Sequence, residues 1–448
     1  MSVDTSMDYW AQVELGEIAE FVMGQAPKKS ECNYQGEGTV FVKAGEFSVI
    51  RPVVKEWTTN PLKRASERDV LVCVVGATAG KLNLGIDCAI GRSVAAIRPL
   101  GDVQNVFIYQ YLRTQVTSLR KGSTGSAQGV ISKTDLHKVT IPFPPLSEQK
   151  VIADKLDTLL AQVENTKARL ERIPQILKRF RQSVLAAAVS GRLTEEWRNG
   201  AKFEVESAAL GKFVSIDIGH AFKSKEFSAR GISLLRGQNI EPGALRWSET
   251  KYFPEAKLSE FHHLFINSGD IVLAMDRPII SSGLKIARAK PSDLPCVLVQ
   301  RVARFKDFND LLADYLYVLL QDISFSNYIQ PNQTGSDIPH ISGKQILAYP
   351  VKIPSIEEQA EIVRQVDQLF AHADRIEQQV NNALSRVNNL TQSILAKAFR
   401  GELTEQWRKD NPELISGENS AEALLERIKA ERAAMKPVKK SRQKRTTA

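Results

Sequence analysis

The sequence predicts two mixed α/β modules in tandem, each followed by one long helix, with the two long helices paired as a coiled coil. Three observations lead to this prediction. The pattern of residues 144–198 recurs, without a gap, as residues 354–408. Each copy contains a long apolar run with heptad spacing. The segments that precede the copies alternate short β-like runs with glycine and proline, which is typical of a mixed fold.

The repeated segment keeps a constant offset of 210 positions, so that Trp197 corresponds to Trp407. Each copy begins with a Glu-Gln pair shortly after a proline and ends with the pattern Gly-x-Leu-Thr-Glu-x-Trp-Arg. The pairs are Glu148-Gln149 and Glu358-Gln359, and the closing patterns are residues 191–198 and 401–408. Two unrelated core helices would not share these flanks, so we interpret the segment as a duplicated unit.

The apolar positions inside each copy recur at alternating steps of four and three, which is the pattern of a coiled-coil seam. We expect each helix to pair with the other copy, in either a parallel or an antiparallel arrangement. Pro174 removes one backbone donor and should kink or loosen the first helix near Leu170. Positions of this seam are Ile152, Leu156, Leu159, Val163, Leu170 and Leu177 in the first copy, and Ile362, Val366, Leu369, Ile376, Val380 and Val387 in the second.

The first module should contain strands near residues 40–43, 70–75 and 94–98, followed by a helix near residues 107–119. The second module repeats this plan with different text: residues 69–72 are echoed by 270–273, and residues 123–126 by 333–336. A shared frame with divergent loops favours two modules that perform one task on different targets. The predicted segments are 1–143, 144–198, 199–353, 354–408 and a charged tail, 409–448.

Residues 76–81 resemble a phosphate-binding loop because glycines precede Lys81 directly after an apolar strand. The glycines are too close together, however, and Leu82 stands where such a loop needs the hydroxyl of Ser or Thr for magnesium. We therefore interpret this segment as a glycine-rich turn that brings a strand end close to a neighbour, such as a DNA backbone.

The composition is that of a globular protein, with 43% hydrophobic and 25% charged residues among 448. The net charge of +9 favours an acidic polymer as a partner. Part of this charge follows a short expected helix at residues 421–434, in a tail that we expect to be disordered and that could serve solubility or contact phosphate. Its basic residues are Lys436, Lys439, Lys440, Arg442, Lys444 and Arg445.

Several classes of protein are disfavoured. No apolar run reaches the roughly 18 residues of a membrane span, and the N-terminal sequence lacks a signal-peptide pattern, so we expect a cytoplasmic protein without a membrane partner. The four cysteines show no paired spacing, which predicts free thiols in a reducing compartment. The six histidines are dispersed, and we expect no metal site.

In its duplicated helices and closing patterns, the chain resembles the specificity subunit of type I restriction-modification systems. The resemblance runs from residues 13–18 to Arg408 and rests on residues 144–152, residues 354–359, the Thr-Gly-Ser turns and the doubled closing pattern. It implies two α/β (α+β) target-recognition domains in tandem, joined by two long helices in an antiparallel coiled coil. Each domain would read one half of a split, asymmetric site in double-stranded DNA. The coil would set the gap between the half-sites and dock two methyltransferase subunits, to which endonuclease-translocase subunits add.

We find no catalytic residues in this chain: it lacks the Asn-Pro-Pro-aromatic quartet of adenine methyltransferases, a Walker loop and a carboxylate-lysine nuclease cluster. We therefore expect no cofactor here, with S-adenosylmethionine, ATP and magnesium on the partner subunits. The alternatives are a stand-alone bipartite DNA-binding regulator and a structural scaffold. Regulators usually dimerise through identical halves, which two differing modules argue against.

Candidate DNA-binding residues are those on loops whose side chains can reach bases or phosphates. The repeat pairs Thr124 with Thr334, which favours these two. The candidates are Lys43, Lys81, Arg92, Ser123, Thr124 and Gln128 in the first module, and Arg236, Gln238, Arg277, Thr334, Ser336 and His340 in the second.

Overall fold

The computed structural model describes residues 9–122, 129–330 and 339–435 of the chain. The chain divides into two compact units, unit 1 from residues 1–170 and 382–448 and unit 2 from residues 171–381. Each unit therefore combines one globular module with half of each long helix. We call residues 9–143 module 1 and residues 199–353 module 2. The five-segment division made from the sequence stays a prediction.

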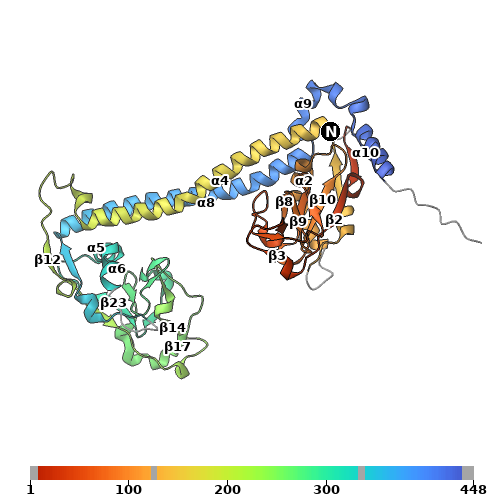
Figure 1. The fold of residues 1–448 in the computed structure, drawn as a ribbon. Helices are drawn as coiled ribbons and strands as arrows, with labels where there is room; N and C mark the ends of the chain where they lie inside the picture. Colours follow the sequence, from red (N-terminus) through yellow and green to blue (C-terminus); the bar gives the residue numbers. More distant parts are fainter. Residues whose placement is uncertain (1–8, 123–128, 331–338, 436–448) are drawn as a thin grey trace, which may run out of the picture. The chain divides into compact units, whose positions relative to one another are not determined.

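Unit 1 is built on one antiparallel sheet and one mixed sheet, with helices packed beside them (Figure 1). One sheet has the order β2-β10-β7-β8, a second has the order β3-β5-β4-β9-β6, and β1 pairs with β11. Its strands are β1 (Ala11–Glu14), β2 (Ala19–Met23), β3 (Cys32–Asn33), β4 (Thr39–Val42), β5 (Glu56–Thr58), β6 (Arg64–Ala65), β7 (Val70–Cys73), β8 (Leu82–Leu84), β9 (Cys88–Ile90), β10 (Val94–Pro99) and β11 (Thr140–Phe143). Its own helices are α1 (Leu15–Ile18), α2 (Asn105–Gly122), α3 (Lys133–His137), α9 (Glu405–Asp410) and α10 (Ala421–Met435).

Unit 2 repeats this frame, with the four-stranded sheet β13-β23-β18-β21 and the three-stranded sheet β17-β14-β22. Its strands are β12 (Glu206–Ala209), β13 (Ser215–Ile218), β14 (Ile232–Leu235), β15 (Ile240–Glu241), β16 (Ala244–Leu245), β17 (Tyr252–Phe253), β18 (Ile271–Ala274), β19 (Ile279–Ile280), β20 (Gly283–Leu284), β21 (Ile286–Arg288), β22 (Cys296–Leu298), β23 (Val302–Lys306) and β24 (Pro350–Ile353). Its own helices are α5 (Ala313–Gln321), α6 (Ile323–Ile329) and α7 (Gly343–Leu347). The expected mixed α/β modules are therefore confirmed.

The expected elements of module 1 are present, with small shifts at their ends. The strands predicted near residues 40–43, 70–75 and 94–98 are β4, β7 and β10, and the predicted helix is α2. Strand β7 ends at Cys73, and beyond it Val75 forms an isolated bridge with Val130. The helix predicted at residues 421–434 is α10, whereas the basic tail after it lies outside the described residues.

The repeated Ile-Ser pairs mark the same local structure in both modules. Ile131 and Ile341 are fully buried. The serine that follows each caps a short helix: Ser132 Oγ accepts a hydrogen bond from the Asp135 backbone, and Ser342 Oγ accepts one from the Gln345 backbone. An N-cap serine with an acidic or amide residue three positions later satisfies two otherwise unpaired amides, so this sequence pair specifies where α3 and α7 begin.

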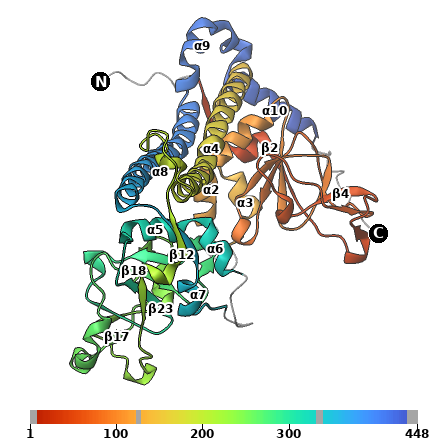
Figure 2. The ribbon, with the colours of Figure 1, turned by 90° about the vertical axis from the view of Figure 1, so that its left-hand side faces the viewer.

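The two long helices, α4 (Leu146–Val189) and α8 (Ile356–Phe399), run antiparallel and lie side by side (Figures 1 and 2). Within unit 1, the N-terminal part of α4 shares its core with the C-terminal part of α8, where Ile152 and Leu156 join Ile394 and Phe399. Within unit 2, the C-terminal part of α4 meets the N-terminal part of α8. There Arg181 forms ion pairs with Asp374 (2.6 Å) and Glu377 (2.9 Å). The antiparallel coiled coil is thus confirmed.

The structure places all the seam positions named above in buried or half-buried environments. Helix α4 continues through Pro174 without interruption. Ile176, two residues after this proline, is 59% exposed. Both long helices end at the glycine of the closing pattern, because Gly191 (φ 73°) and Gly401 (φ 75°) adopt the left-handed conformation. Glycine is the residue that takes this conformation at least cost, so the pattern acts as a helix stop.

The two ends of the duplicated segment bind each other across the copies. In unit 1, fully buried Glu148 at the start of α4 accepts hydrogen bonds from Arg408 (2.5 Å) and Thr404 (2.5 Å), which follow α8, and from Trp10 Nε1 (2.9 Å). The neighbouring Gln149 binds module 1 instead, because its Oε1 accepts a hydrogen bond from the Gln104 backbone (3.3 Å). The Glu-Gln pair therefore anchors the closing pattern and the module to the coil.

The same arrangement recurs in unit 2. Glu358 at the start of α8 accepts hydrogen bonds from Arg198 (2.5 Å) and Thr194 (2.6 Å), which follow α4. Gln359 Oε1 accepts from the Leu312 backbone (2.7 Å). The glutamate of each pair is thus bound by the closing pattern of the other copy, as an antiparallel pair of helices requires.

No helix within residues 9–122, 129–330 and 339–435 is long and apolar enough to cross a membrane. The four cysteines are free thiols, as expected, and all except Cys32 are buried. In the described part of the chain, no three residues of the kinds that bind metal gather into a possible site.

Candidate nucleic-acid interface

The candidate residues of module 1 that the structure describes lie where several strands end at one side of the sheets. The parallel strands β4 and β9 both end there, and the Gly91 backbone, just after β9, donates to the carbonyl of Val42 at the end of β4 (2.9 Å). Strands β7 and β8 meet at the same side through a hydrogen bond from the Cys73 backbone to Lys81 (2.8 Å). Lys43, Lys81 and Arg92 directly follow or precede these strand ends. We call this the strand-end surface of module 1.

The glycine-rich turn at residues 76–81 belongs to this surface. Gly76 (φ 73°) and Gly80 (φ 82°) both adopt backbone angles that favour glycine. The Gly76 backbone donates to Gly129 (3.3 Å), which brings the chain after residue 128 to the same place. Candidates Ser123, Thr124 and Gln128 themselves lie outside the described residues. The turn connects β7 to β8.

Two of the three described candidates in module 1 are already engaged by the protein. Lys43 forms an ion pair with Glu56. Burial opposes the charge on Lys43, but the hydrogen bond and charge of Glu56 outweigh it and raise the pKa of the amine. Lys81 Nζ donates to the Phe47 carbonyl (2.7 Å) and so fastens the loop after β4. Arg92 is exposed, and its side chain has no ion pair or hydrogen bond within the described ranges.

Module 2 has a matching strand-end surface at the ends of β14, β18 and β22. The Val299 backbone donates to Leu235 (3.1 Å), and the Ala274 backbone donates to Lys285 (2.9 Å), as their counterparts do in module 1. Residues 276 and 340 form an isolated bridge. The structure thus brings together Arg236, Gln238, Arg277 and His340, whereas Thr334 and Ser336 lie outside the described residues.

The candidates of module 2 differ in how firmly they are held. Arg236 donates to the Glu249 carbonyl (2.7 Å), and burial lowers its pKa. Its buried Nε has no hydrogen-bond partner among the described residues. Gln238 is exposed and lies 3.4 Å from Glu249. Arg277 is exposed, and its guanidinium makes no ion pair or hydrogen bond with any described residue. His340 is half-buried in the bridge with Asp276.

Sequence reasoning missed several polar residues at the same surface. Arg301 precedes β23 and lies 3.8 Å from Asp276, and Gln300 and His220 are joined by a backbone hydrogen bond of 2.9 Å. Lys285 lies where Lys81 does in module 1, and burial lowers its pKa. The correspondence of Lys81 with Lys285 lies in hydrogen-bond register rather than in sequence spacing, so the 210-residue offset could not find it.

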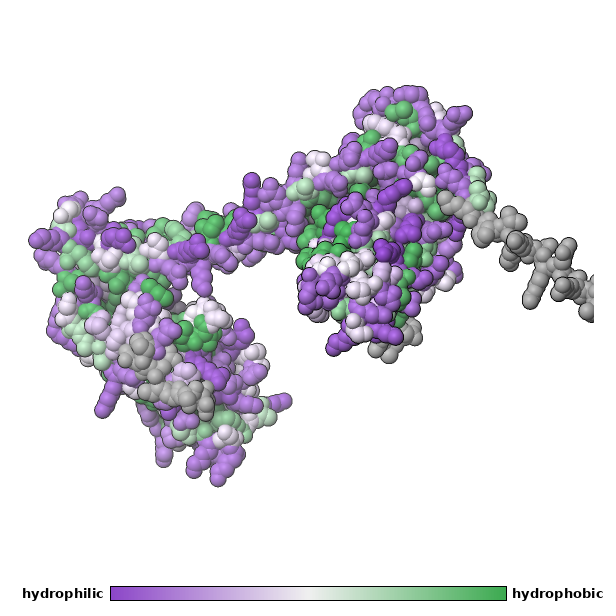
Figure 3. All heavy atoms as spheres, viewed as in Figure 1, coloured by the Kyte–Doolittle hydropathy of each residue, from purple (hydrophilic) through white to green (hydrophobic). Residues whose placement is uncertain are grey.

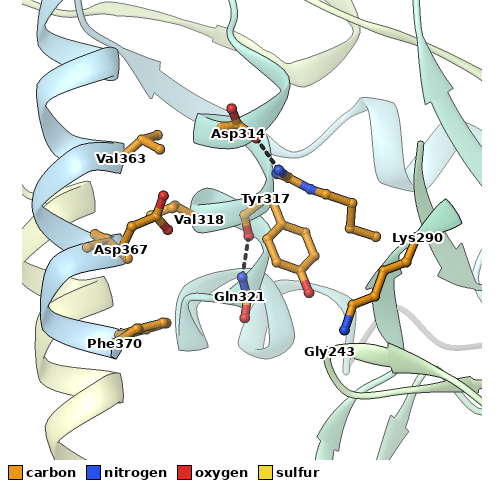
Figure 4. Close-up of a pocket in the computed structure, with 11 residues that line it drawn as sticks. Gly243, Lys290, Asp314, Tyr317, Val318, Gln321, Val363, Asp367 and Phe370 are labelled. Carbon is orange, nitrogen blue, oxygen red and sulfur yellow. Dashed lines mark hydrogen bonds and ion pairs between the residues drawn. The ribbon is translucent and has the colours of Figure 1, made fainter. Parts of the chain in front are cut away.

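A cleft of about 280 Å³ lies at the other end of β21, against α5 and α8 (Figure 4). Arg288 pairs there with Asp314 and lies over the Tyr317 ring, 5.1 Å from its centre. Asp367 points into the cleft from α8, and burial, reinforced by Asp314, raises its pKa. These contacts hold α5 beside α8 and lie at the opposite end of β21 from the strand-end surface.

Polar and charged residues cover most of the visible face of both modules (Figure 3).

Comparison with known proteins agrees with this architecture. The family model described as "Type I restriction modification DNA specificity domain" matches residues 7–175 and 210–386. The type I restriction enzyme EcoKI specificity subunit of Escherichia coli K12 is 43% identical, over 99% of this chain and 100% of its own length. The StySPI specificity subunit of Salmonella potsdam is 37% identical, over 97% of this chain and 98% of its own.

Two solved structures share the fold at low sequence identity. A chain from a study of complex assembly and conformational transition of the type I R-M system has a TM-score of 0.69 at 19% identity, covering 88% of this chain and 98% of its own. The HsdS subunit from Thermoanaerobacter tengcongensis has a TM-score of 0.58 at 20% identity, covering 88% and 97%. By its sequence and its duplicated fold, this chain belongs to the family of type I restriction enzyme specificity subunits.

Proposed function

We propose that this chain is the non-catalytic, DNA-reading subunit of a type I restriction-modification complex. Module 1 reads one half of a split, asymmetric site in double-stranded DNA, and module 2 reads the other half. The coiled coil docks two methyltransferase subunits, to which endonuclease-translocase subunits add. S-adenosylmethionine, ATP and magnesium bind those partners, and the complex works in the cytoplasm.

The observation that carries this proposal is the pair of strand-end surfaces. Both are built on the same hydrogen-bond frame, since Val74 and Met275 donate from equivalent positions to Ser93 (2.9 Å) and Arg301 (2.9 Å). The side chains on the two frames differ, however, with serine in one module where the other has arginine. One frame with two sets of donors and acceptors suits two different base sequences, because sequence is read by side chains in the groove.

Family membership supports the division of labour. The relatives are named as specificity subunits of restriction enzymes, which sets them apart from the subunits that carry out the reaction. The net charge of +9 suits a polyanionic partner, and neutralising phosphates makes such binding depend on salt. We expect affinity for DNA to fall steeply as salt rises, for both specific and non-specific sequences.

The test combines the chain with a methyltransferase subunit of the family and maps methylated adenines across a genome. We expect methylation only when both proteins are present, at a motif with two specific parts and a gap of fixed length. The purified chain alone, with S-adenosylmethionine added, should transfer no methyl group and is the control. Methyl transfer by the chain alone, or an undivided or palindromic motif, would contradict the proposal.

Exchange of residues 203–349 for the equivalent segment of a relative tests whether the modules read independently. We expect only one half of the motif to change, because each module reads its own stretch of groove. The reciprocal exchange in module 1 should change only the other half. A change in both halves after a single exchange would show that the modules do not read separately.

A further inference from the structure

Two arginines at the strand-end surface of module 2 have a backbone conformation that is costly for them. Arg277 has a φ of 44° and Arg301 a φ of 63°. Residues other than glycine avoid this region because Cβ approaches the carbonyl oxygen, and an isolated outlier persists only where its surroundings enforce it. Such outliers gather at functional sites, so the occurrence of two on one surface needs an explanation.

Module 1 shows that the frame itself does not require arginine at either position. The Arg277 backbone donates to Pro339 (2.7 Å), as Gly76 donates to Gly129 in module 1, so Arg277 occupies the place of a glycine. Ser93 corresponds to Arg301 and has no positive φ. Glycine would adopt the backbone of Arg277 without strain, so the arginine side chain is retained at a cost to stability.

The side chains are available for a ligand. The guanidinium of Arg277 is exposed and has no ion pair or hydrogen bond in the part of the chain that the structure describes. Arg301 is about half exposed, at 49% of its side chain, and only its Nε is near a carboxylate, 3.8 Å from Asp276. Neither outer nitrogen of Arg301 has an ion pair or hydrogen bond with a residue that the structure describes, while Asp276 limits how the side chain can turn.

The chemistry of this group favours a base edge over a phosphate. The planar fork of arginine fits the two acceptors, O6 and N7, that guanine presents in the major groove. Asp276 directly precedes Arg277 in sequence and lies 3.8 Å from Arg301, and its negative charge would repel a phosphate. A carboxylate beside this fork can instead accept a hydrogen bond from the amino group of the cytosine that pairs with guanine.

We propose that Arg277 and Arg301 determine the specificity of the second half-site by reading guanine in the major groove. This inference rests on the proposed function, because it assigns base contacts within a half-site that module 2 reads. It predicts that this half-site contains guanine on one strand or the other, and that Asp276 positions the guanidinium of Arg301.

The decisive variant is Arg277→Gly, which restores the residue found in module 1. Because it removes backbone strain, the variant should melt at the same temperature as the wild type or higher. Its complex with the methyltransferase should nevertheless lose preference for guanine at one position, by roughly 10- to 100-fold in methylation rate, within one half-site only. Arg301→Ser should have the same kind of effect at a neighbouring position.

Arg277→Lys separates base reading from charge. Lysine keeps the positive charge but lacks the fork, so we expect guanine preference to fall while binding to random DNA and its salt dependence are retained. Arg230→Ala is the matched control, because Arg230 is exposed and precedes β14, at the opposite end of that strand from the surface. This variant should leave the preference for every base unchanged.

The assay is methylation of a DNA library randomised at each position of the motif, using the complex with the methyltransferase subunit. The inference is overturned if Arg277→Gly and Arg301→Ser leave every base preference intact, or if methylation falls uniformly across sequences, as loss of a phosphate contact would cause. It is also overturned if the half-site contains no guanine. In each of these cases a two-part motif would still stand, whereas its absence in the wild type would reject the proposed function itself.

Discussion

The clamp between Glu148 and Arg408 allows a quantitative test of how the duplicated segment holds unit 1 together. Glu148 is fully buried and Arg408 is 5% exposed, and the carboxylate also accepts from Thr404 and Trp10. Arg408→Ala would leave a buried carboxylate with two neutral donors and no cation. Breaking a buried pair from one side costs about 3–5 kcal/mol, because the remaining charge stays desolvated. We expect a loss of that size in the free energy of opening at the start of α4.

The measurement is native-state hydrogen exchange of the amides in the first turns of α4, because a chain of two units need not unfold in one step. Lys409→Ala is the matched control: its ion pair with Glu405 is more than half exposed and should contribute about 0.5 kcal/mol or less. Arg198→Ala makes the equivalent change in unit 2, where the pair is slightly more exposed, and should cost less than Arg408→Ala. If Arg408→Ala costs no more than Lys409→Ala, the clamp does not hold this end of the coil.

Three further changes test individual features of the fold. Burial raises the pKa of Asp367, so folding disfavours its charged form: Asp367→Asn should raise the melting temperature at pH 7, and this gain should vanish once pH falls below the ordinary aspartate range. Gly191→Ala would place Cβ 2.4 Å from the Phe203 ring in addition to left-handed strain, and should lower the melting temperature more than Gly200→Ala, where φ is 84° and nothing lies within 4 Å. Burial raises the pKa of three thiols to about 11 or 12, so a thiol reagent at pH 8 should label Cys32 in the folded protein well before Cys73, Cys88 and Cys296.

The heptad seam illustrates what local pattern can determine. The period of apolar residues along a helix sets which face is buried, so positions such as Ile152 and Ile362 could be assigned to the seam from spacing alone. The mixed α/β modules followed from short apolar runs between turn residues, which specify strands through local propensity. The ends of these strands do not follow from local propensity, because the chain beyond β7 is held by the distant residue Ile131, whose backbone donates to Val74.

The candidate interface shows where local pattern is insufficient. The offset of 210 residues equates residues within the duplicated segment and at the end of each module, but not in the middle of the modules, where the numbering is shifted. Arg277 therefore has its counterpart in Gly76, a correspondence that only the hydrogen-bond register reveals. The contacts of Lys43 with Glu56 and of Lys81 with Phe47 could not be predicted from local sequence either, since these partners lie 13 and 34 residues away.

The sequence by itself determined that Glu148 and Arg408 belong to a duplicated pattern, that two helices pair, and which of their faces meet. The residue pattern left the direction of the helices open. The family resemblance implied an antiparallel pair, and the tertiary structure shows it, so that Glu148 binds Arg408 rather than Arg198 of its own copy. Heptad spacing is the same for either direction of a partner helix, whereas direction decides which ends meet. Pairing of side chains 260 residues apart is fixed by burial of whole helix faces, and no local pattern encodes it.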